Sequence, residues 1–169
     1  MPVLIRSKIE LKNFPSKRAW RAAMVKGHDA QGQHWHQHML KEHFRRNSRQ
    51  RYGYKPRSEK YERRKRFGNT GKQGFRGRAK YMGMVDLVCE GDLEESIRGW
   101  ATIRAFPSRV TVAMNGPSYL RINYKPNRPN LAREITAVIP EEEKLLADVM
   151  DDVVTREMNR TGETRTITI

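Results

Sequence analysis

The stretch that decides the fold is residues 140–160, which read PEEEKLLADVMDDVVTREMNR. Apolar side chains recur there every three or four positions, and this spacing places them on one face of an α-helix. The members of this stripe are Leu145, Leu146, Val149, Met150, Val153, Val154 and Met158. Pro140 suits the first position of a helix, and the three Glu that follow it are favoured by the helix dipole. The pattern predicts a helix that ends near Thr161 and Gly162.

The other side of this helix carries Asp148, Asp151 and Asp152. Carboxylates on the polar side of an amphipathic helix are ordinarily solvated. Nine acidic and three basic residues lie between positions 134 and 163, so the C-terminal region as a whole is acidic. Two interpretations stay open, solvated charge and an acidic docking face for a basic neighbour, and these three Asp are the candidate residues for the second.

A second long helix is predicted over residues 16–46. One face of it collects side chains at steps of three and four. They are Trp20, Met24, His28, Gln31, Trp35 and Met39, and Leu40 and Phe44 extend the face. Gly27 and Gly32 each cost about 1 kcal/mol relative to Ala inside a helix, so we expect a kink or break between them.

A β-hairpin is predicted from residues 97–106 and 109–114, where apolar and polar residues alternate on both sides of Pro107 and Ser108. Residues 91–97 lead into it as a helical turn or a strand entry. Further strands are expected at 3–11, 119–124, 134–139 and 164–169.

These elements predict an α+β fold. A small antiparallel sheet, made of hairpin 97–114 with an N-terminal and a C-terminal strand, packs against the long N-terminal helix and the C-terminal helix. A length of 169 residues fits a single domain, residues 1–169. Residues 45–86 are expected to be inserted in that domain as a long, extended basic arm.

The arm holds most of the positive charge of the chain. Between positions 45 and 80 there are 15 Lys or Arg and only two Glu, whereas the whole chain has a formal net charge of +15. The rest of the protein is therefore close to neutral. Charge of one sign at this density opposes compaction unless an anionic partner lies close by. This segment is the main indication of function, and it predicts nucleic acid or an acidic protein surface as the partner.

No sustained helical or strand period runs through the arm, and Gly53, Pro56 and Gly68 help to interrupt it. A short helix at 58–66 is possible, because Ser58 is a good N-cap residue. The rest is predicted to be an extended loop, and a loop of this length inside a compact domain is usually functional or disordered.

Aromatic residues are interleaved with the basic ones. Such a mixture suits single-stranded nucleic acid through base stacking, duplex DNA through its phosphates, or an acidic protein through Arg and Tyr anchors. We favour a protein interface over nucleic-acid binding, and both over a plain solvated loop, which ordinarily lacks aromatics. The candidate arm residues are Arg51, Tyr52, Tyr54, Arg57, Tyr61, Arg63, Arg64, Lys65, Arg66, Phe67, Phe75, Arg76, Arg78 and Tyr81.

The sequence gives little support for catalysis. It has no nucleophile elbow and no phosphate-cradling glycine loop ahead of a helix. His34 and His38 stand at a metal-ligand spacing, but no third ligand is evident, so a polar helix face is the preferred interpretation over a metal site or a nuclease. We expect no enzyme activity, no metal and no cofactor. Cys89 is the one cysteine, and no apolar run is long enough for a membrane span, so a soluble protein of a reducing compartment is expected.

Several phrases resemble the virion morphogenesis proteins of tailed bacteriophages. YKPRSEKYERRK at 54–65 resembles their Tyr, Pro-Arg-Ser, Tyr and Lys pattern, and LVCEGDLEESI at 87–97 resembles a second phrase. The hairpin that ends in GPSY at 116–119 and the Glu-rich helix entered through Pro140 follow in the same order. The resemblance covers about residues 45–160, and it points to the tail-completion or neck proteins that join the phage head to its tail.

What the resemblance implies is a structural α+β subunit, not an enzyme. Such a subunit forms a homo-oligomeric ring, with six copies expected, around the DNA channel. Its partners are the connector or adaptor above and the tail terminator or tube proteins below, with a possible contact to DNA and none to a membrane. The chain would then be assembled in the host cytoplasm and end in the neck of the virion, and the basic arm would become ordered when it docks. The alternative function is a nucleic-acid-binding module that uses residues 45–80.

Overall fold

The computed structural model describes residues 16–67, 92–99, 101–117 and 129–161. The chain divides into two compact units that alternate along the sequence. Unit 1 comprises the chain up to His36, residues 102–113 and the chain from Pro140 onward. Unit 2 comprises residues 37–101 and 114–139. The mixture of long helices and an antiparallel hairpin confirms the predicted α+β class, whereas the single domain with an inserted arm stays a prediction.

Helix α1 (Lys17–His34) begins where the sequence predicts, because the Ser16 hydroxyl accepts a hydrogen bond of 3.2 Å from the amide of Ala19. The chain then continues as a π-helical turn, η1 (Trp35–Met39), and a 3₁₀ helix, η2 (Leu40–Phe44). The predicted extent, 16–46, is thus nearly that of the three segments together. The irregular part lies in the last ten residues of this run.

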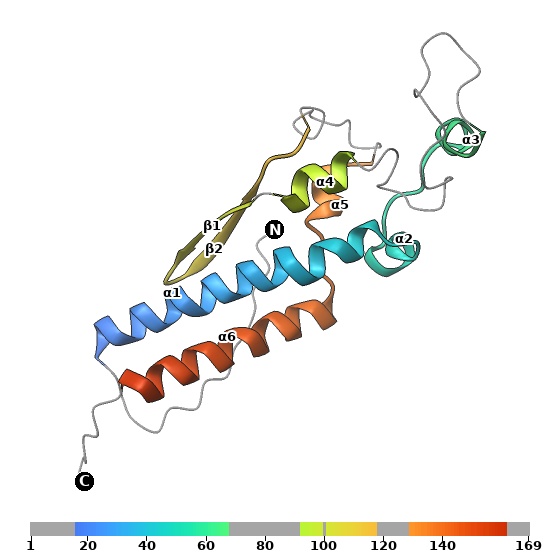
Figure 1. Ribbon diagram of the computed structural model, residues 1–169. Coiled ribbons are helices and arrows are strands. Elements are labelled where there is room, and N and C mark those ends of the chain that lie inside the picture. Colours follow the sequence, from blue (N-terminus) through green and yellow to red (C-terminus); the bar gives the residue numbers. More distant parts are fainter. Residues whose placement is uncertain (1–15, 68–91, 100, 118–128, 162–169) are drawn as a thin grey trace. The chain divides into compact units, whose positions relative to one another are not determined.

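Helix α6 (Pro140–Thr161) has the predicted bounds and lies side by side with α1 in unit 1 (Figure 1). The seam between them is apolar: Ala23 of α1 is buried with Met150, Val154 and Met158 of α6. Burial of such side chains is the main favourable term that holds two helices together. One predicted member of the stripe is wrong, because Leu145 is 47% exposed. Its neighbour Leu146 takes the inward position instead.

The break predicted at the two glycines is wrong, since α1 runs through both of them. A Cβ at Gly27 would lie 2.7 Å from Val154 Cγ2, and one at Gly32 would lie 2.8 Å from Val110 Cγ2. These distances are too short for a side chain, so each glycine allows a neighbouring element to approach the helix backbone. The close packing outweighs the cost of about 1 kcal/mol that glycine brings to a helix interior.

Two polar contacts also join α1 to α6. The amide Nε2 of the buried Gln31 donates to the main-chain oxygen of Leu146 at 2.9 Å. Lys26 Nζ lies 2.6 Å from Glu157 Oε2, in a pair whose side chains are 50% and 19% exposed. The hydrogen bond from Lys26 lowers the pKa of Glu157.

The hairpin consists of β1 (Ala101–Phe106) and β2 (Arg109–Met114), joined at Pro107 and Ser108 as predicted. Its expected start at residue 97 is wrong, because α4 (Asp92–Gly99) precedes it as a helix in which Ile97 is buried. Ile103 and Val110 face Gly32 of α1. The hairpin therefore covers α1 within unit 1.

Unit 2 is built around η2, which packs against α2 (Ser48–Tyr52), α4 and α5 (Leu131–Ile135). Its apolar core is buried. The core residues are Leu40, Phe44, Leu93, Ile97 and Ile135. The strand predicted at 134–139 is wrong, because its first two residues belong to α5. Asn130 caps this helix, since its side chain accepts a hydrogen bond of 3.0 Å from the Arg133 amide.

The predicted helix at 58–66 is confirmed as α3 (Glu59–Phe67), whereas the loop expected around residue 50 is wrong because α2 is helical. The strands expected at 3–11, 119–124 and 164–169 lie outside the described residues, as does the arm beyond residue 67.

Candidate interaction surface

The first part of the basic segment folds back on itself. Helix α2 ends at Gly53, whose φ of 63° lies in the left-handed region that favours glycine. The amide of Tyr54 then donates to the main-chain oxygen of Arg49 at 3.1 Å. This turn directs both Tyr52 and Tyr54 into unit 2, where both are buried.

Three rings stack in the core of unit 2. The ring centroids of His43 and Tyr52 are 3.9 Å apart, and those of Tyr52 and Tyr54 are 5.7 Å apart, with nearly parallel planes. His43 Nδ1 lies 2.5 Å from the Tyr54 hydroxyl. We name these three residues the ring stack. It fixes the main chain from 52 to 54 against η2, which carries His43.

His43 is neutral over most of the pH range. Its side chain is fully buried, and desolvation lowers its pKa from 6.5 to about 4. A main-chain interaction with Glu134 acts in the opposite direction and is smaller, while the charge of Arg51 adds to the lowering. A neutral imidazole suits a buried site against the Tyr52 ring, because an imidazolium there would be a buried charge.

A buried ion pair holds the next part of the segment. Arg57 donates from Nη1 to Glu134 Oε1 at 3.1 Å and from Nη2 to Glu134 Oε2 at 2.5 Å. The two side chains are 6% and 9% exposed. Such a two-point pair fixes both position and orientation. It ties residue 57 to α5, 77 positions further along the chain.

These contacts correct three of the predicted arm residues. Tyr52, Tyr54 and Arg57 were expected on an extended arm, but they are packed inside unit 2. No local signal predicts this burial, because the partners are His43 and Glu134, which lie 11 and 77 positions away. Glu134 lies in the segment that the sequence predicts as a strand.

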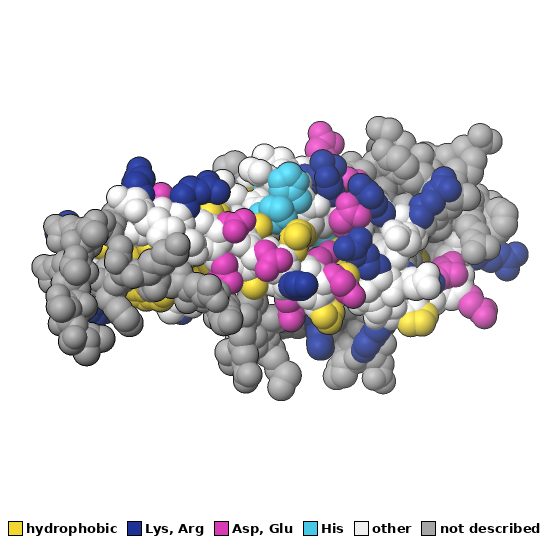
Figure 2. Space-filling view, turned by 90° about the horizontal axis from the view of Figure 1, so that it is seen from below, with side chains coloured by type: hydrophobic (Ala, Val, Ile, Leu, Met, Phe, Trp, Pro, Cys, Tyr) yellow, Lys and Arg dark blue, Asp and Glu magenta, His cyan; other side chains and the backbone are white. Residues whose placement is uncertain are grey.

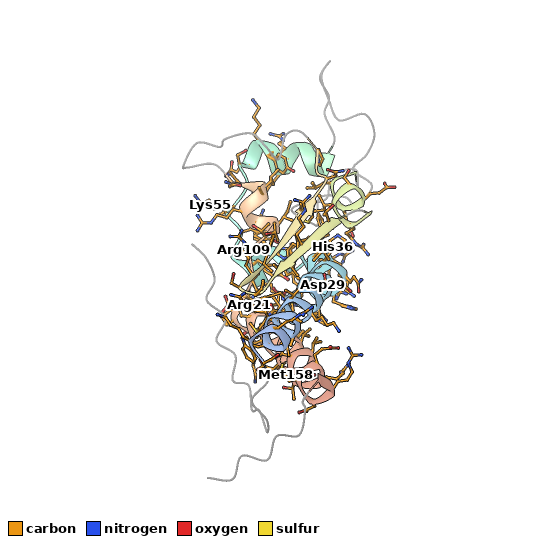
Figure 3. The ribbon with its side chains drawn as sticks, turned by 90° about the vertical axis from the view of Figure 1, so that its left-hand side faces the viewer. Arg21, Asp29, His36, Lys55, Arg109 and Met158 are labelled. Carbon is orange, nitrogen blue, oxygen red and sulfur yellow. The ribbon has the colours of Figure 1, made fainter. Side chains whose placement is uncertain are left out.

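Around α2, the remaining cations lie on the surface. Arg45, Arg46, Arg51 and Lys55 are exposed, and we call them the α2 cationic surface. Glu42 lies 3.0 Å from Arg45 and 3.7 Å from Arg51, so one carboxylate fixes two of the four. Lys55, labelled in Figure 3, projects from the outside of its unit. The four charges therefore stand on a backbone that the ring stack holds in place.

Helix α3 follows directly. Ser58 caps it, because its hydroxyl accepts from the amide of Tyr61 at 3.3 Å. Arg49 of α2 lies 2.9 Å from Glu62 of α3, so a partly exposed ion pair joins the two helices. Lys60 and Arg63 are exposed, and Tyr61 is half-buried.

For the last predicted arm residues, the backbone is described as far as Phe67. Arg64, Lys65, Arg66 and Phe67 belong to α3 by their backbone. Phe75, Arg76, Arg78 and Tyr81 lie outside the described residues.

The candidate acidic face lies on α6. Asp148 and Asp152 are exposed, and Asp151 is half-buried with its Oδ1 shielded from solvent. Figure 2 views the molecule from the side on which α6 lies in Figure 1, and Asp and Glu side chains gather on this face with Lys and Arg among them. Asp148 and Asp152 lie on the solvent side of α6, as predicted, whereas Asp151 is only partly exposed.

The histidines do not form a metal centre in the described part of the chain. Among these residues, no group of three or more His, Cys, Asp or Glu side chains could hold a metal ion. His34 and His38 therefore gain no third ligand from the same set.

Among the described residues, no helix has the length and apolarity to cross a membrane.

Comparisons with family models, with curated proteins and with solved structures find no match to this chain.

Proposed function

We propose that the chain is a structural subunit of a tailed-phage virion, a neck or tail-completion component that forms a ring and joins the head connector to the tail. The order of the phrases at 54–65, 87–97 and 116–119, followed by the helix entered through Pro140, supports this assignment. The subunit acts by assembly, without catalysis, metal or cofactor. It is assembled in the host cytoplasm and resides in the virion.

The separation of charge between two exposed surfaces is the observation that carries the assembly proposal. Asp148 and Asp152 of α6 are exposed, and so are the four cations of the α2 cationic surface. Surfaces of opposite charge on identical subunits form heterologous contacts, in which the α6 face of one copy meets the α2 cationic surface of the next. Repetition of one such contact closes a ring if a whole number of the rotations between neighbouring copies adds up to one full turn.

The α2 cationic surface is also preorganised for binding. Glu42 holds Arg45 and Arg51, and the ring stack holds the main chain beneath them. A partner therefore meets side chains that have already lost part of their conformational freedom, which lowers the entropic cost of association. An unanchored arm would pay that cost on docking.

The size of the purified protein tests the proposal. Mass photometry at physiological salt should show a closed oligomer of one mass. Replacing Asp148→Lys and Asp152→Lys places like charges in the contact, so the assembled fraction should fall by roughly tenfold or more at equal concentration. A matched control, Glu59→Lys with Glu95→Lys, makes the same charge change at two exposed Glu outside α6 and should assemble like the wild type.

A wild-type protein that stays monomeric, even with a phage connector present, would contradict the ring. Equal loss of assembly in both double variants would show that net charge, and not the α6 face, controls association.

A further inference from the structure

The charge density of α3 is unusual for a protein helix. Between Lys60 and Arg66 it carries five Lys or Arg. An α-helix rises about 1.5 Å per residue, so these seven positions span about 10 Å and hold one cation per about 2 Å of axis. The two Glu of α3 reduce the net charge of this nine-residue helix to +3, or one positive charge per about 4.5 Å of axis. A partner that neutralises α3 needs a comparable density of negative charge.

Two kinds of partner can be compared on this scale. Duplex DNA carries one negative charge per about 1.7 Å of its axis. The acidic helix of this chain, α6, carries seven carboxylates and three basic residues in 22 residues. Its net charge of −4 is one negative charge per about 8 Å of axis. The net charge density of α3 therefore exceeds what an acidic helix such as α6 could neutralise, whereas a duplex supplies enough negative charge.

The exposed cations of α3 are available to such a partner. Lys60 and Arg63 are exposed, and no carboxylate of the described residues forms a salt bridge with either of them. Glu62 is engaged with Arg49 of α2 at 2.9 Å. Because Glu62 is paired with Arg49, its carboxylate neutralises less of the charge of the neighbouring cations on α3. The pair also joins α3 to α2.

The burial of two aromatics bears on how nucleic acid would bind. Tyr52 and Tyr54 are buried in the ring stack with His43, so they cannot stack on bases. Of the sequence-predicted aromatics with a described side chain, Tyr61 alone remains at the surface of this segment, and it is half-buried. Single-strand binding needs several exposed rings, whereas duplex binding through phosphates needs cations alone.

We propose that α3 is a surface that binds the phosphate backbone of double-stranded DNA without reading its sequence, through Lys60 and Arg63. This activity does not rest on the proposed ring. The α2 cationic surface serves the contact between subunits, and α3 serves DNA. A ring around a DNA channel is one setting in which both surfaces are used at once.

Fluorescence anisotropy with a labelled duplex of mixed sequence tests the proposal. Binding should weaken linearly on a log–log plot between about 50 and 200 mM salt, with a slope of about −0.9 for each phosphate neutralised. The Lys60→Gln/Arg63→Gln variant should bind roughly tenfold or more weakly at the low end, and the magnitude of its slope should fall by about 2.

The matched control removes two exposed cations from α1, Arg18→Gln with Arg21→Gln, and has the same net charge as the α3 variant. It should keep the wild-type slope. Far-UV circular dichroism of both variants checks that they are folded. Two scrambled duplexes of the same length should bind with equal affinity, because phosphates carry no sequence information.

Four results would overturn the proposal. The α3 variant could bind like the wild type, or the α1 control could lose as much affinity as the α3 variant. A polyglutamate peptide could bind more tightly than the duplex, which would assign α3 to an acidic protein. A single strand could bind more tightly than the duplex and lose that binding on Tyr61→Leu, which would assign it to base stacking. Ring mass measured without DNA is an independent readout, so failure here leaves the proposed function to its own test.

Discussion

The seam between α1 and α6 and the core of unit 2 are held together by different chemistry. The seam is apolar, with Ala23, Val154 and Met158 buried at positions that follow the helical period. The core of unit 2 buries a histidine, two tyrosines and an arginine–glutamate pair beside its apolar residues. The first kind of packing depends on shape and volume, whereas the second also depends on the placement of each polar partner.

One ion pair in each region makes the difference measurable. Lys26 and Glu157 form an exposed pair on the seam, and Arg57 and Glu134 form a buried pair in unit 2. In water, each ion of an exposed pair keeps its solvation after the partner is removed. A buried ion does not, so loss of one partner leaves a charge with neither water nor counterion. The two regions should therefore respond very differently to the same substitution.

The largest effect is expected for Arg57→Ala. It leaves the Glu134 carboxylate buried and without its guanidinium, which should lower the free energy of unfolding of unit 2 by about 3–5 kcal/mol. Urea denaturation monitored by tyrosine fluorescence or by circular dichroism measures this loss.

The matched control replaces both partners, Arg57→Met with Glu134→Leu. It removes both charges and keeps most of the volume, so it should recover most of the lost stability. Equal destabilisation by the single and the double substitution would mean that the pair contributes volume and not charge, and the contrast between the two regions would fail.

The next effect is a pH dependence that belongs to unit 2. Burial lowers the pKa of His43 from 6.5 to about 4. The unfolded chain therefore binds a proton between these values that the folded chain does not bind, and stability falls as the pH decreases through this window. The loss from this one residue amounts to about 3 kcal/mol by pH 4, and there is none above about pH 6.5.

Denaturation curves at several pH values check this, with His43→Phe as the comparison. That variant keeps a ring in the stack and removes the titrating group, so its stability should depend less on pH between about 4 and 6.5. An unchanged pH profile in the variant would assign the dependence to other groups.

A smaller effect is expected at the seam. Gly27→Ala would place a Cβ 2.7 Å from Val154 Cγ2, and Val154 is fully buried and branched. Overpacking of this kind costs about 1–3 kcal/mol, although Ala is the better helix former. Adding Val154→Ala should couple favourably to Gly27→Ala in a double-mutant cycle. Gly99→Ala, where a Cβ meets nothing within 4 Å, is the control and should show little change.

The smallest effect is expected for Lys26→Ala. Because half of the Lys26 side chain is exposed, loss of the pair with Glu157 should leave the unfolding transition nearly unchanged. The pKa of Glu157 should rise towards its ordinary value, since the hydrogen bond from Lys26 is the main cause of its lowering. NMR titration of the Glu157 carboxyl measures this shift. A large loss of stability in this variant would remove the contrast with Arg57→Ala.

The elements that the sequence predicts well are those with local signals. Pro140 and the apolar stripe of α6 define a helix without reference to the rest of the chain, and Ser16 and Ser58 mark the starts of α1 and α3. The turn at Pro107 and Ser108 predicts the hairpin for the same reason. In each case the period or the cap belongs to the segment itself.

The errors about buried positions concern contacts between distant residues. Gly27 and Gly32 predict a weak helix by propensity, but α6 and the hairpin occupy the space that a Cβ would need. Arg57 predicts an exposed cation until Glu134, 77 positions away, is known to face it. The aromatic residues of the basic segment were assigned to one surface, although Tyr52 and Tyr54 belong to the core. Tertiary partners outweigh local preference at these sites.

The central claim is that charge of opposite sign on α6 and around α2 drives assembly between copies, and a charge-exchange experiment tests it most directly. One variant carries Asp148→Lys and Asp152→Lys. The other carries Arg46→Glu, Arg51→Glu and Lys55→Glu, which changes the charge of the four-residue α2 cationic surface from +4 to −2. Mass photometry of each variant alone should show monomers, and an equimolar mixture should form oligomers of the wild-type mass, because every contact in an alternating ring again pairs opposite charges. A mixture that stays monomeric under conditions where the wild type assembles would contradict the account.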